Sequence, residues 1–209
     1  MKARWTATAM IVGYAAVLGG FTLIAPNEAL ARKSSMERLV EKGYSTVAAE
    51  NSVKVQSGGE LEVAFSPNGG ATNLVIKVIQ SAKTSIRVLA YSFTSAPIAQ
   101  ALVEAHKRGV DVQVVLDKSQ KSEKYSSATF VANAGIPIRI DSKHAIAHNK
   151  VVIVDGHTVQ QGSFNYTKAA EQSNGENVLV NWNNPKLADV YLKDWNRHWD
   201  HSDQVAARY

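Results

Sequence analysis

A histidine and a lysine stand two positions apart, directly before a short apolar run. The stretch from His148 to Asn165 has the sequence HNKVVIVDGHTVQQGSFN. Its four apolar residues, 151–154, are β-branched, which predicts a buried strand. Residues i and i+2 of a strand point to the same face, so we expect His148 and Lys150 to project together.

The apolar run is followed by signals for a hairpin. The Asp-Gly pair at 155–156 is typical of a tight turn. Residues 158–161 then predict a returning strand. Such a hairpin would bring Ser163 and Asn165 back to the level of His148.

The side chains gathered in this way suit phosphoryl transfer. A neutral imidazole is a competent nucleophile at phosphorus, and its ordinary pKa lies near working pH. A neighbouring ammonium, a hydroxyl and an amide can hold the non-bridging oxygens and offset the charge of the transition state. This chemistry needs no cluster of metal ligands and no cofactor.

The pattern H-x-K-x4-D, followed by G-S-x-N, resembles the phospholipase D superfamily and, within it, the short bacterial Nuc-type endonucleases. The matching positions are His148, Lys150 and Asp155 for the HKD motif, Gly162, Ser163 and Asn165 for G-S-x-N, and Glu176 for the downstream acidic residue. The resemblance extends from about residue 61 to about residue 199.

The resemblance implies a role for each of these residues. His148 is expected to attack phosphorus, while Lys150, Ser163 and Asn165 hold the phosphate. Glu176 is expected to orient the His148 ring and to stabilise its charged form. Asp155 lies too far along the strand to react and is expected, like Gly162, to be structural.

The chain contains one HKD motif, and no second H-x-K and no internal duplication are found. In-line displacement through a histidine needs a nucleophile and, opposite it, a general acid. The resemblance therefore implies a homodimer in which His148 and Lys150 of both chains meet across a two-fold axis. The loop 117–125 is a candidate for part of the contact.

The first 31 residues have the features of a bacterial secretory signal peptide. Lys2 and Arg4 supply the positive start, residues 6–25 are uncharged, and Ala29-Leu30-Ala31 fits a cleavage site. We therefore expect a periplasmic or secreted protein with no stable membrane insertion after cleavage. An uncleaved membrane anchor is the competing interpretation.

Composition adds weaker constraints. The formal net charge is +5 at pH 7, which suits a polyanionic substrate without proving one. No cysteine is present, so disulfides cannot hold the fold together. Residues 32–60 are polar and predict an arm or linker, with an interaction tail as the alternative.

Residues 61–209 are predicted to form one catalytic domain. Strand and helix patterns alternate there with short connections, which predicts an α/β fold: a mixed β-sheet sandwiched between helices. Strands are expected at 61–65, 85–91, 110–116, 136–140, 151–154, 158–161 and 178–181, and helices at 71–82, 95–108, 126–134, 167–172 and from 185 onward.

Other histidines and the tryptophans have ordinary interpretations. His144 and His148 have the H-x-x-x-H spacing of a zinc pair, but Ala145 stands where such a site needs glutamate, so we predict no metal there. We interpret His106, His157, His198 and His201, and likewise Trp182, Trp195 and Trp199, as packing or surface residues.

The residues together predict a secreted, metal-independent phosphodiesterase that cleaves DNA, with RNA as an alternative substrate, through a phosphohistidine. One rival is an enzyme of the same superfamily that hydrolyses phospholipid head groups, because the site chemistry would be the same. The other rival is a silent nucleic-acid-binding module, against which the complete residue set argues.

Overall fold

The computed structural model describes residues 53–56, 58–121 and 126–205. The predicted signal peptide, most of the predicted arm and the tip of the loop 117–125 lie outside these ranges. Within the described ranges, none of the helices combines the length and the apolar character that a membrane crossing requires.

The described residues form one mixed sheet of eight strands, in the order β1-β7-β6-β5-β2-β3-β4-β8. Strands β2, β3 and β4 are parallel, and the other neighbours are antiparallel. The strands are β1 (Glu60–Ser66), β2 (Ser85–Ala90), β3 (Asp111–Asp117), β4 (Ile138–Asp141), β5 (Lys150–Val154), β6 (Thr158–Gly162), β7 (Glu176–Trp182) and β8 (Asp203–Gln204).

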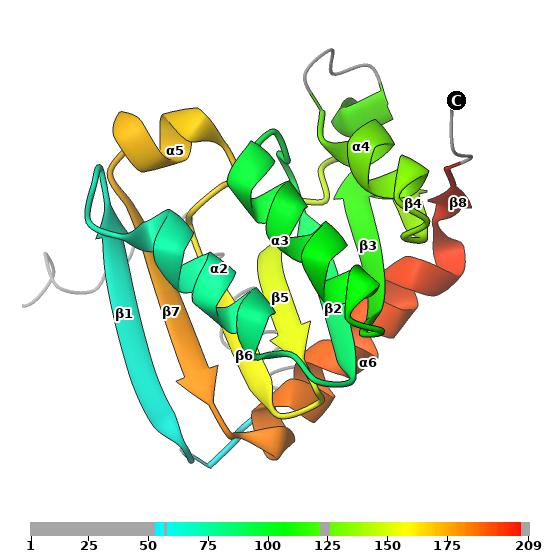
Figure 1. The fold of residues 1–209 in the computed structure, drawn as a ribbon. Helices are drawn as coiled ribbons and strands as arrows, with labels where there is room; N and C mark the ends of the chain where they lie inside the picture. The colour runs from blue at the N-terminus through cyan, green and yellow to red at the C-terminus, as the bar shows by residue number, and fades with distance from the viewer. Residues whose placement is uncertain (1–52, 57, 122–125, 206–209) are drawn as a thin grey trace, which may run out of the picture. The chain divides into compact units, whose positions relative to one another are not determined.

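Helices cover both faces of this sheet, so the predicted sandwich is confirmed. Figure 1 shows α2 and α3 in front of the sheet and α6 behind it. The helices are α2 (Ala71–Ser81), α3 (Ala96–Lys107), α4 (Ala128–Asn133), α5 (Lys168–Gln172) and α6 (Pro185–His201), with a short 3-10 helix, η1 (Lys118–Lys121).

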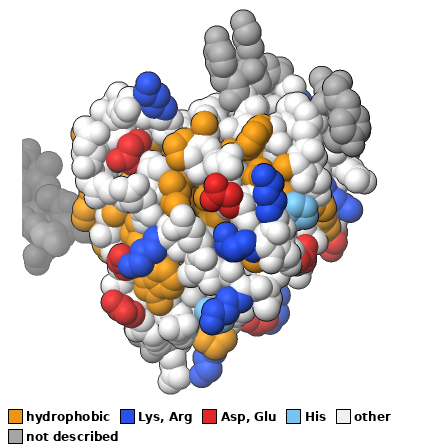
Figure 2. All heavy atoms as spheres, in the orientation of Figure 1, with side chains coloured by type: hydrophobic (Ala, Val, Ile, Leu, Met, Phe, Trp, Pro, Cys, Tyr) orange, Lys and Arg blue, Asp and Glu red, His pale blue; other side chains and the backbone are white. Residues whose placement is uncertain are grey.

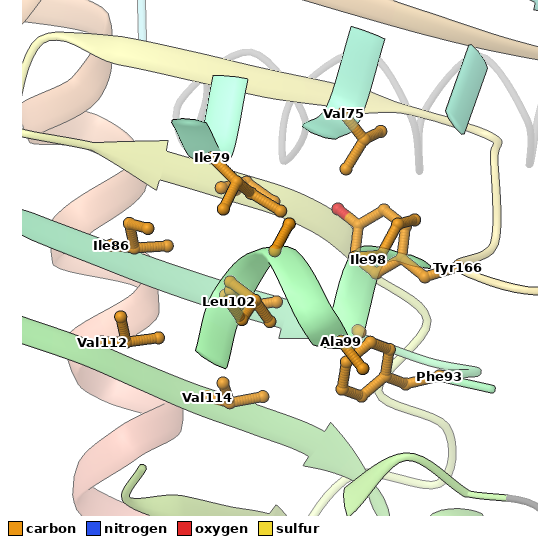
Figure 3. Close-up of a cluster of buried hydrophobic side chains, with 14 of the residues drawn as sticks. Val75, Ile79, Ile86, Phe93, Ile98, Ala99, Leu102, Val112, Val114 and Tyr166 are labelled. Carbon is orange, nitrogen blue, oxygen red and sulfur yellow. The ribbon is translucent and has the colours of Figure 1, made fainter. Parts of the chain in front are cut away.

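The main core lies between the sheet and the helices α2 and α3. Ile79 of α2 and Leu102 of α3 are fully buried against Ile86 of β2 and its neighbours (Figure 3). Full burial of one such side chain stabilises the fold by about 1.5–3 kcal/mol. The apolar faces of both helices therefore hold them on the sheet.

A second, smaller core lies between the sheet and α6. Leu89, Val115 and Ile153 point to this face, because side chains alternate along a strand. Trp195 of α6 is 2% exposed, and its Nε1–H donates to the carbonyl of Val88 at 3.0 Å. The helix begins where predicted, since Asn184 accepts a hydrogen bond from the amide of Leu187 at 3.1 Å.

Most element boundaries lie within two residues of the prediction, and one strand was missed. Helix α4 begins at Ala128, two residues later than expected. Strand β7 begins at Glu176, so this carboxylate lies at a strand end rather than in a loop. Strand β8 was not predicted, because two residues carry no recognisable period.

The net positive charge is not gathered on the face that α2 and α3 cover. Figure 2 shows basic side chains interspersed there with acidic and apolar ones.

Candidate active site

The motif residues lie where four neighbouring strands, β7, β6, β5 and β2, have their ends on the same side of the sheet. Ala90, the last residue of β2, pairs with Lys150, the first residue of β5. The antiparallel register of β5 and β6 sets Lys150 level with Gly162. Gly162 in turn pairs with Val178, near the start of β7. The hairpin therefore brings the HKD and G-S-x-N motifs together, as predicted.

His148 lies beside these strand ends with its side chain exposed, just before β5 rather than within it. Its ring packs against the ring of Tyr91 at a centroid distance of 4.5 Å. Lys150 Nζ lies 3.0 Å from His148 Nδ1 and donates to the His148 carbonyl at 2.9 Å. The imidazole and the ammonium thus project together, as predicted. Because its ring is exposed, His148 is not a buried core residue.

Lys150 itself is buried, with 5% of its surface exposed. Burial lowers the pKa of its ammonium, and the nearby carboxylate of Glu176 offsets only part of that effect. The Nζ atom also lies 5.1 Å from the centre of the Tyr91 ring, where the ring's negative face stabilises a cation. A desolvated cation beside a nucleophile is well placed to attract a phosphate.

Ser163 follows Gly162, the last residue of β6, where the backbone of β7 lies close. Its hydroxyl oxygen accepts hydrogen bonds from the amide of Asn177 at 3.1 Å and from the Asn177 side chain at 3.3 Å. A Cβ on Gly162 would lie 2.2 Å from the carbonyl oxygen of Asn177. Glycine is therefore required before the serine by the approach of the neighbouring backbone.

Asn165 stands between two aromatic residues that anchor its segment. Phe164 and Tyr166 are fully buried, and the Tyr166 carbonyl accepts from the amides of Thr94 and Ser95, both at 2.9 Å. Burial raises the pKa of the Tyr166 phenol, although its hydrogen bond to Gln160 acts in the opposite direction. Asn165 Oδ1 is buried and has no hydrogen-bond partner within the described residues.

Glu176 is near the site, but the contact predicted for it is not formed within one chain. Its carboxylate accepts from Asn174 Nδ2 at 3.1 Å, and its amide donates to Ser66 Oγ at 3.2 Å. It acts on Lys150 through charge. The predicted hydrogen bond between Glu176 and the His148 ring stays a prediction.

Asp155 has a structural position, at the turn of the hairpin. Its two carboxylate oxygens accept from the amides of Lys83, Thr84 and Ser85 at 2.8–2.9 Å, and from the Thr84 hydroxyl at 2.8 Å. Burial opposes its ionisation, but these hydrogen bonds outweigh it and hold the pKa of Asp155 below its ordinary value. The turn is thus fastened to the α2–β2 connection.

The sequence reasoning missed two residues that position His148. Tyr91 supports the ring, and its amide donates to the Asn149 carbonyl at 2.9 Å. Asp117, at the end of β3, accepts from the amide of Ala147 at 2.7 Å and is 2% exposed. Each follows an apolar strand, but only the sheet order shows that these strand ends adjoin the motif.

A second group of polar side chains meets beside β4. Asp141, His144, His198 and His201 place their ligand atoms within 4.8 Å of one another. His144 therefore groups with two histidines of α6 and not with His148. His198 and His201, which the sequence led us to interpret as packing or surface residues, thus belong to a polar cluster.

Comparisons with known proteins agree with this geometry. A family model described as cardiolipin synthase, PLD-like domain, matches residues 75–199. The chain belongs to the phospholipase D superfamily. It is a hydrolase of the phosphodiesterase type, with one HKD motif, as the sequence predicted.

Relatives within the phospholipase D superfamily have different names. A protein named phospholipase D from Rickettsia bellii is 40% identical over 139 residues, 66% of this chain and 69% of that protein. A mitochondrial cardiolipin hydrolase from Danio rerio is 33% identical over 140 residues, 66% of this chain and 61% of that protein.

A solved structure of the phospholipase D family is also similar. Nuc from Salmonella typhimurium has 49% sequence identity and a TM-score of 0.69, covering 71% of this chain and 99% of that one. NucT from Helicobacter pylori, at 22% identity and a TM-score of 0.62, covers 70% of this chain and 100% of that one and shows the same fold.

Proposed function

We propose that the protein is an endonuclease that cleaves DNA without sequence preference, with RNA as an alternative substrate. The observation that carries the proposal is the exposed His148 ring beside the buried Lys150 ammonium, at 3.0 Å. The similarity to Nuc and the net charge of +5 support a nucleic acid as substrate.

The reaction that we propose has two steps. In the first, a ring nitrogen of His148 bonds to phosphorus, the phosphorus–oxygen ester bond breaks, and His148 of the partner subunit protonates the leaving oxygen. In the second, that same partner histidine takes a proton from water, whose oxygen bonds to phosphorus as the phosphorus–nitrogen bond breaks. Lys150, Ser163 and Asn165 hold the non-bridging oxygens in both steps.

The tautomer of His148 constrains how this reaction begins. An ammonium can only donate, so Lys150 in its charged form directs the Nδ1 lone pair toward itself and leaves the ring proton on Nε2. Attack through Nε2 requires the proton on Nδ1, facing an acceptor. The predicted contact with Glu176 would supply that acceptor.

A homodimer is part of the proposal, because one chain supplies one nucleophile. The unpartnered Asn165 Oδ1 supports it, since a buried acceptor is costly until a donor reaches it. Two histidines of opposite protonation state titrate as a coupled pair, so the rate should be bell-shaped in pH. A rate independent of pH across the neutral range would contradict this assignment.

The test uses supercoiled plasmid and purified protein in excess EDTA. Wild type should nick the plasmid, and His148→Ala should not. His106→Ala, on α3, is the matched control and should behave as wild type. Nicking by His148→Ala at the wild-type rate would sink the proposal.

A direct test follows the covalent intermediate. Wild type quenched during turnover of a radiolabelled oligonucleotide should carry label that is stable in alkali and lost in acid, as expected of a phosphorus–nitrogen bond. His148→Ala should carry none. Labelling of a different residue would rule out the proposed nucleophile whatever the effect of EDTA on activity.

The second candidate is hydrolysis of phospholipid head groups, which the names of the Rickettsia and Danio relatives favour. Phospholipid vesicles should not slow plasmid nicking if DNA is the substrate. Head-group release from vesicles, with no nicking of DNA, would transfer the proposal to the lipid.

We also propose a periplasmic or secreted location, which the composition of residues 1–31 supports.

A further inference from the structure

The four side chains beside β4 converge on one carboxylate oxygen. Asp141 Oδ2 lies 2.7 Å from His144 Nδ1, 2.7 Å from His198 Nδ1 and 3.1 Å from His201 Nε2. Asp141 is completely buried, and His198 is buried beside it. The three imidazole rings pack with their centres 4.7–5.5 Å apart.

Hydrogen bonding alone does not satisfy this cluster. A carboxylate oxygen has two lone pairs, which the Nδ1 atoms of His144 and His198 already use. His201 Nε2 is close enough to the same oxygen, but it is buried and makes no hydrogen bond of acceptable geometry there. One buried nitrogen is therefore aimed at the cluster without a partner, which is costly in the absence of a further ligand.

We propose that Asp141, His144, His198 and His201 bind one divalent transition-metal ion, for which Zn²⁺ is the best fit. Three imidazole nitrogens and one carboxylate oxygen form a donor set that zinc accepts in tetrahedral geometry, whereas magnesium and calcium prefer oxygen. Tetrahedral bonds of about 2.0–2.2 Å set the donor atoms about 3.3 Å apart. The present separations, from 2.7 Å upward and all within 4.8 Å, lie on both sides of that value.

The surroundings of the cluster are already fixed without a metal. Asp141 Oδ1 accepts from the amides of Lys143 and His144 at 3.0 and 3.2 Å, which orients the carboxylate. Arg139 of β4 donates to the Trp199 carbonyl at 2.7 Å, which holds the end of α6 against the strand. Burial opposes ionisation of Asp141, but the histidine contacts outweigh it and keep its pKa far below the ordinary value.

The position of the ion gives it a structural role. Asp141 ends β4, and the connection 142–149, which contains His148, then passes the ends of β3 and β2. The amide of Ala147 in this connection donates a hydrogen bond to the Asp117 carboxylate of β3, and the Asn149 carbonyl accepts one from the amide of Tyr91, which follows β2. The ion would join the start of the connection, at Asp141 and His144, to the end of α6. It would therefore hold the segment that carries the nucleophile without touching the reacting phosphate.

Zinc binding by the purified full chain tests the proposal directly. After treatment with EDTA and dialysis, wild type should take up one Zn²⁺ per chain in competition with a chromophoric chelator. His144→Gln and His201→Gln should bind at least about 10-fold more weakly. His106→Gln, on the opposite side of the sheet, should bind as wild type does. Uptake below one ion per chain by wild type, or uptake unchanged in both cluster variants, would overturn the proposal.

Two further readouts of wild type do not depend on the variants folding. Co²⁺ should give the intense visible absorption of a tetrahedral site, and a weak octahedral spectrum would exclude this donor set. Adding Zn²⁺ should slow amide hydrogen exchange in residues 142–149, and unchanged exchange there would exclude the structural role. Neither readout depends on nuclease activity, so they stay separate from the test of the proposed function.

Discussion

Lys150 holds a charged group where most water is excluded. Its ammonium is desolvated beside His148, and its pKa is lowered for that reason. A cation in such a place weakens the fold and strengthens attraction for phosphate, because both effects grow as the local dielectric falls. The residue should therefore matter more for the reaction than for stability.

Replacing Lys150 by methionine tests this trade-off. Methionine has a similar length and no charge, so we expect kcat to fall about 10²–10³-fold while the thermal midpoint does not fall. The assay is hydrolysis of a chromogenic phosphodiester beside thermal unfolding, with Lys193→Met, on the exposed face of α6, as control. A lower midpoint with little change in kcat would show that Lys150 is structural instead.

The lowered pKa also gives a pH dependence with a definite sign. Folded protein releases the Lys150 proton at a lower pH than unfolded protein, so the unfolded state binds more protons between the two pKa values. Wild type should therefore gain stability relative to Lys150→Met as the pH rises toward 10.5, the ordinary value. Urea unfolding of both proteins at several alkaline pH values measures this difference, which should not be constant.

At the scale of elements, the hairpin β5–β6 is fastened at both ends. Asp155 fastens its turn through three backbone amides, and Gly162 allows its other end to lie close to β7. These two positions keep Lys150 and Ser163 in register without taking part in the reaction.

The charge of Asp155 can be removed with little change of shape. Asparagine tolerates the positive φ of 51° found there. Asp155→Asn should lower the free energy of unfolding at pH 7 by about 1.5–3 kcal/mol, the value of hydrogen bonds to a charged group. Because the pKa of Asp155 is lowered in the folded state, its stabilisation is present above the ordinary value and lost as the pH falls below it. Urea unfolding should show a gap between the two proteins at pH 7 that shrinks in acid.

Gly162→Ala probes the close approach of β6 and β7. A Cβ there meets the Asn177 carbonyl oxygen at 2.2 Å, so one strand must move. We expect a loss of about 1–3 kcal/mol in stability, as for overpacked interiors, and reduced nicking because Ser163 moves too. Gly175→Ala is the control, since its Cβ would meet no atom within 4 Å. Equal effects of the two substitutions in urea unfolding would contradict the steric argument.

Patterns between residues close in sequence predicted most of these helices and strands. The site residues that were missed depend instead on contacts between segments far apart in the chain. The hairpin could be predicted because strand alternation, an Asp-Gly turn and the motif lie within about 20 residues. Tyr91 and Asp117 could not be assigned to the site, because their roles depend on which strands are neighbours. The histidine cluster was missed for the same reason: His198 lies 57 residues from Asp141 along the chain.

At the scale of the whole molecule, the proposed dimer makes activity depend on both chains. If each site needs His148 from two subunits, only dimers with two intact histidines react. Mixing wild type with His148→Ala under exchanging conditions should then give nicking proportional to the square of the wild-type fraction. A linear dependence would mean that each chain acts alone. Dilution of wild type with an unrelated protein is the control and should be linear.

The sheet order also has a consequence for how the protein is made. Strand β1 lies at the sheet edge with β7 as its neighbour, and Glu60 pairs with Trp182. During synthesis, β1 leaves the ribosome more than one hundred residues before the strand that completes it. Closing so long a loop is slow, because its entropy is lost before the contacts form. Strand β1 is the first of the described strands to be synthesised, and it therefore cannot pair until nearly the whole domain is available.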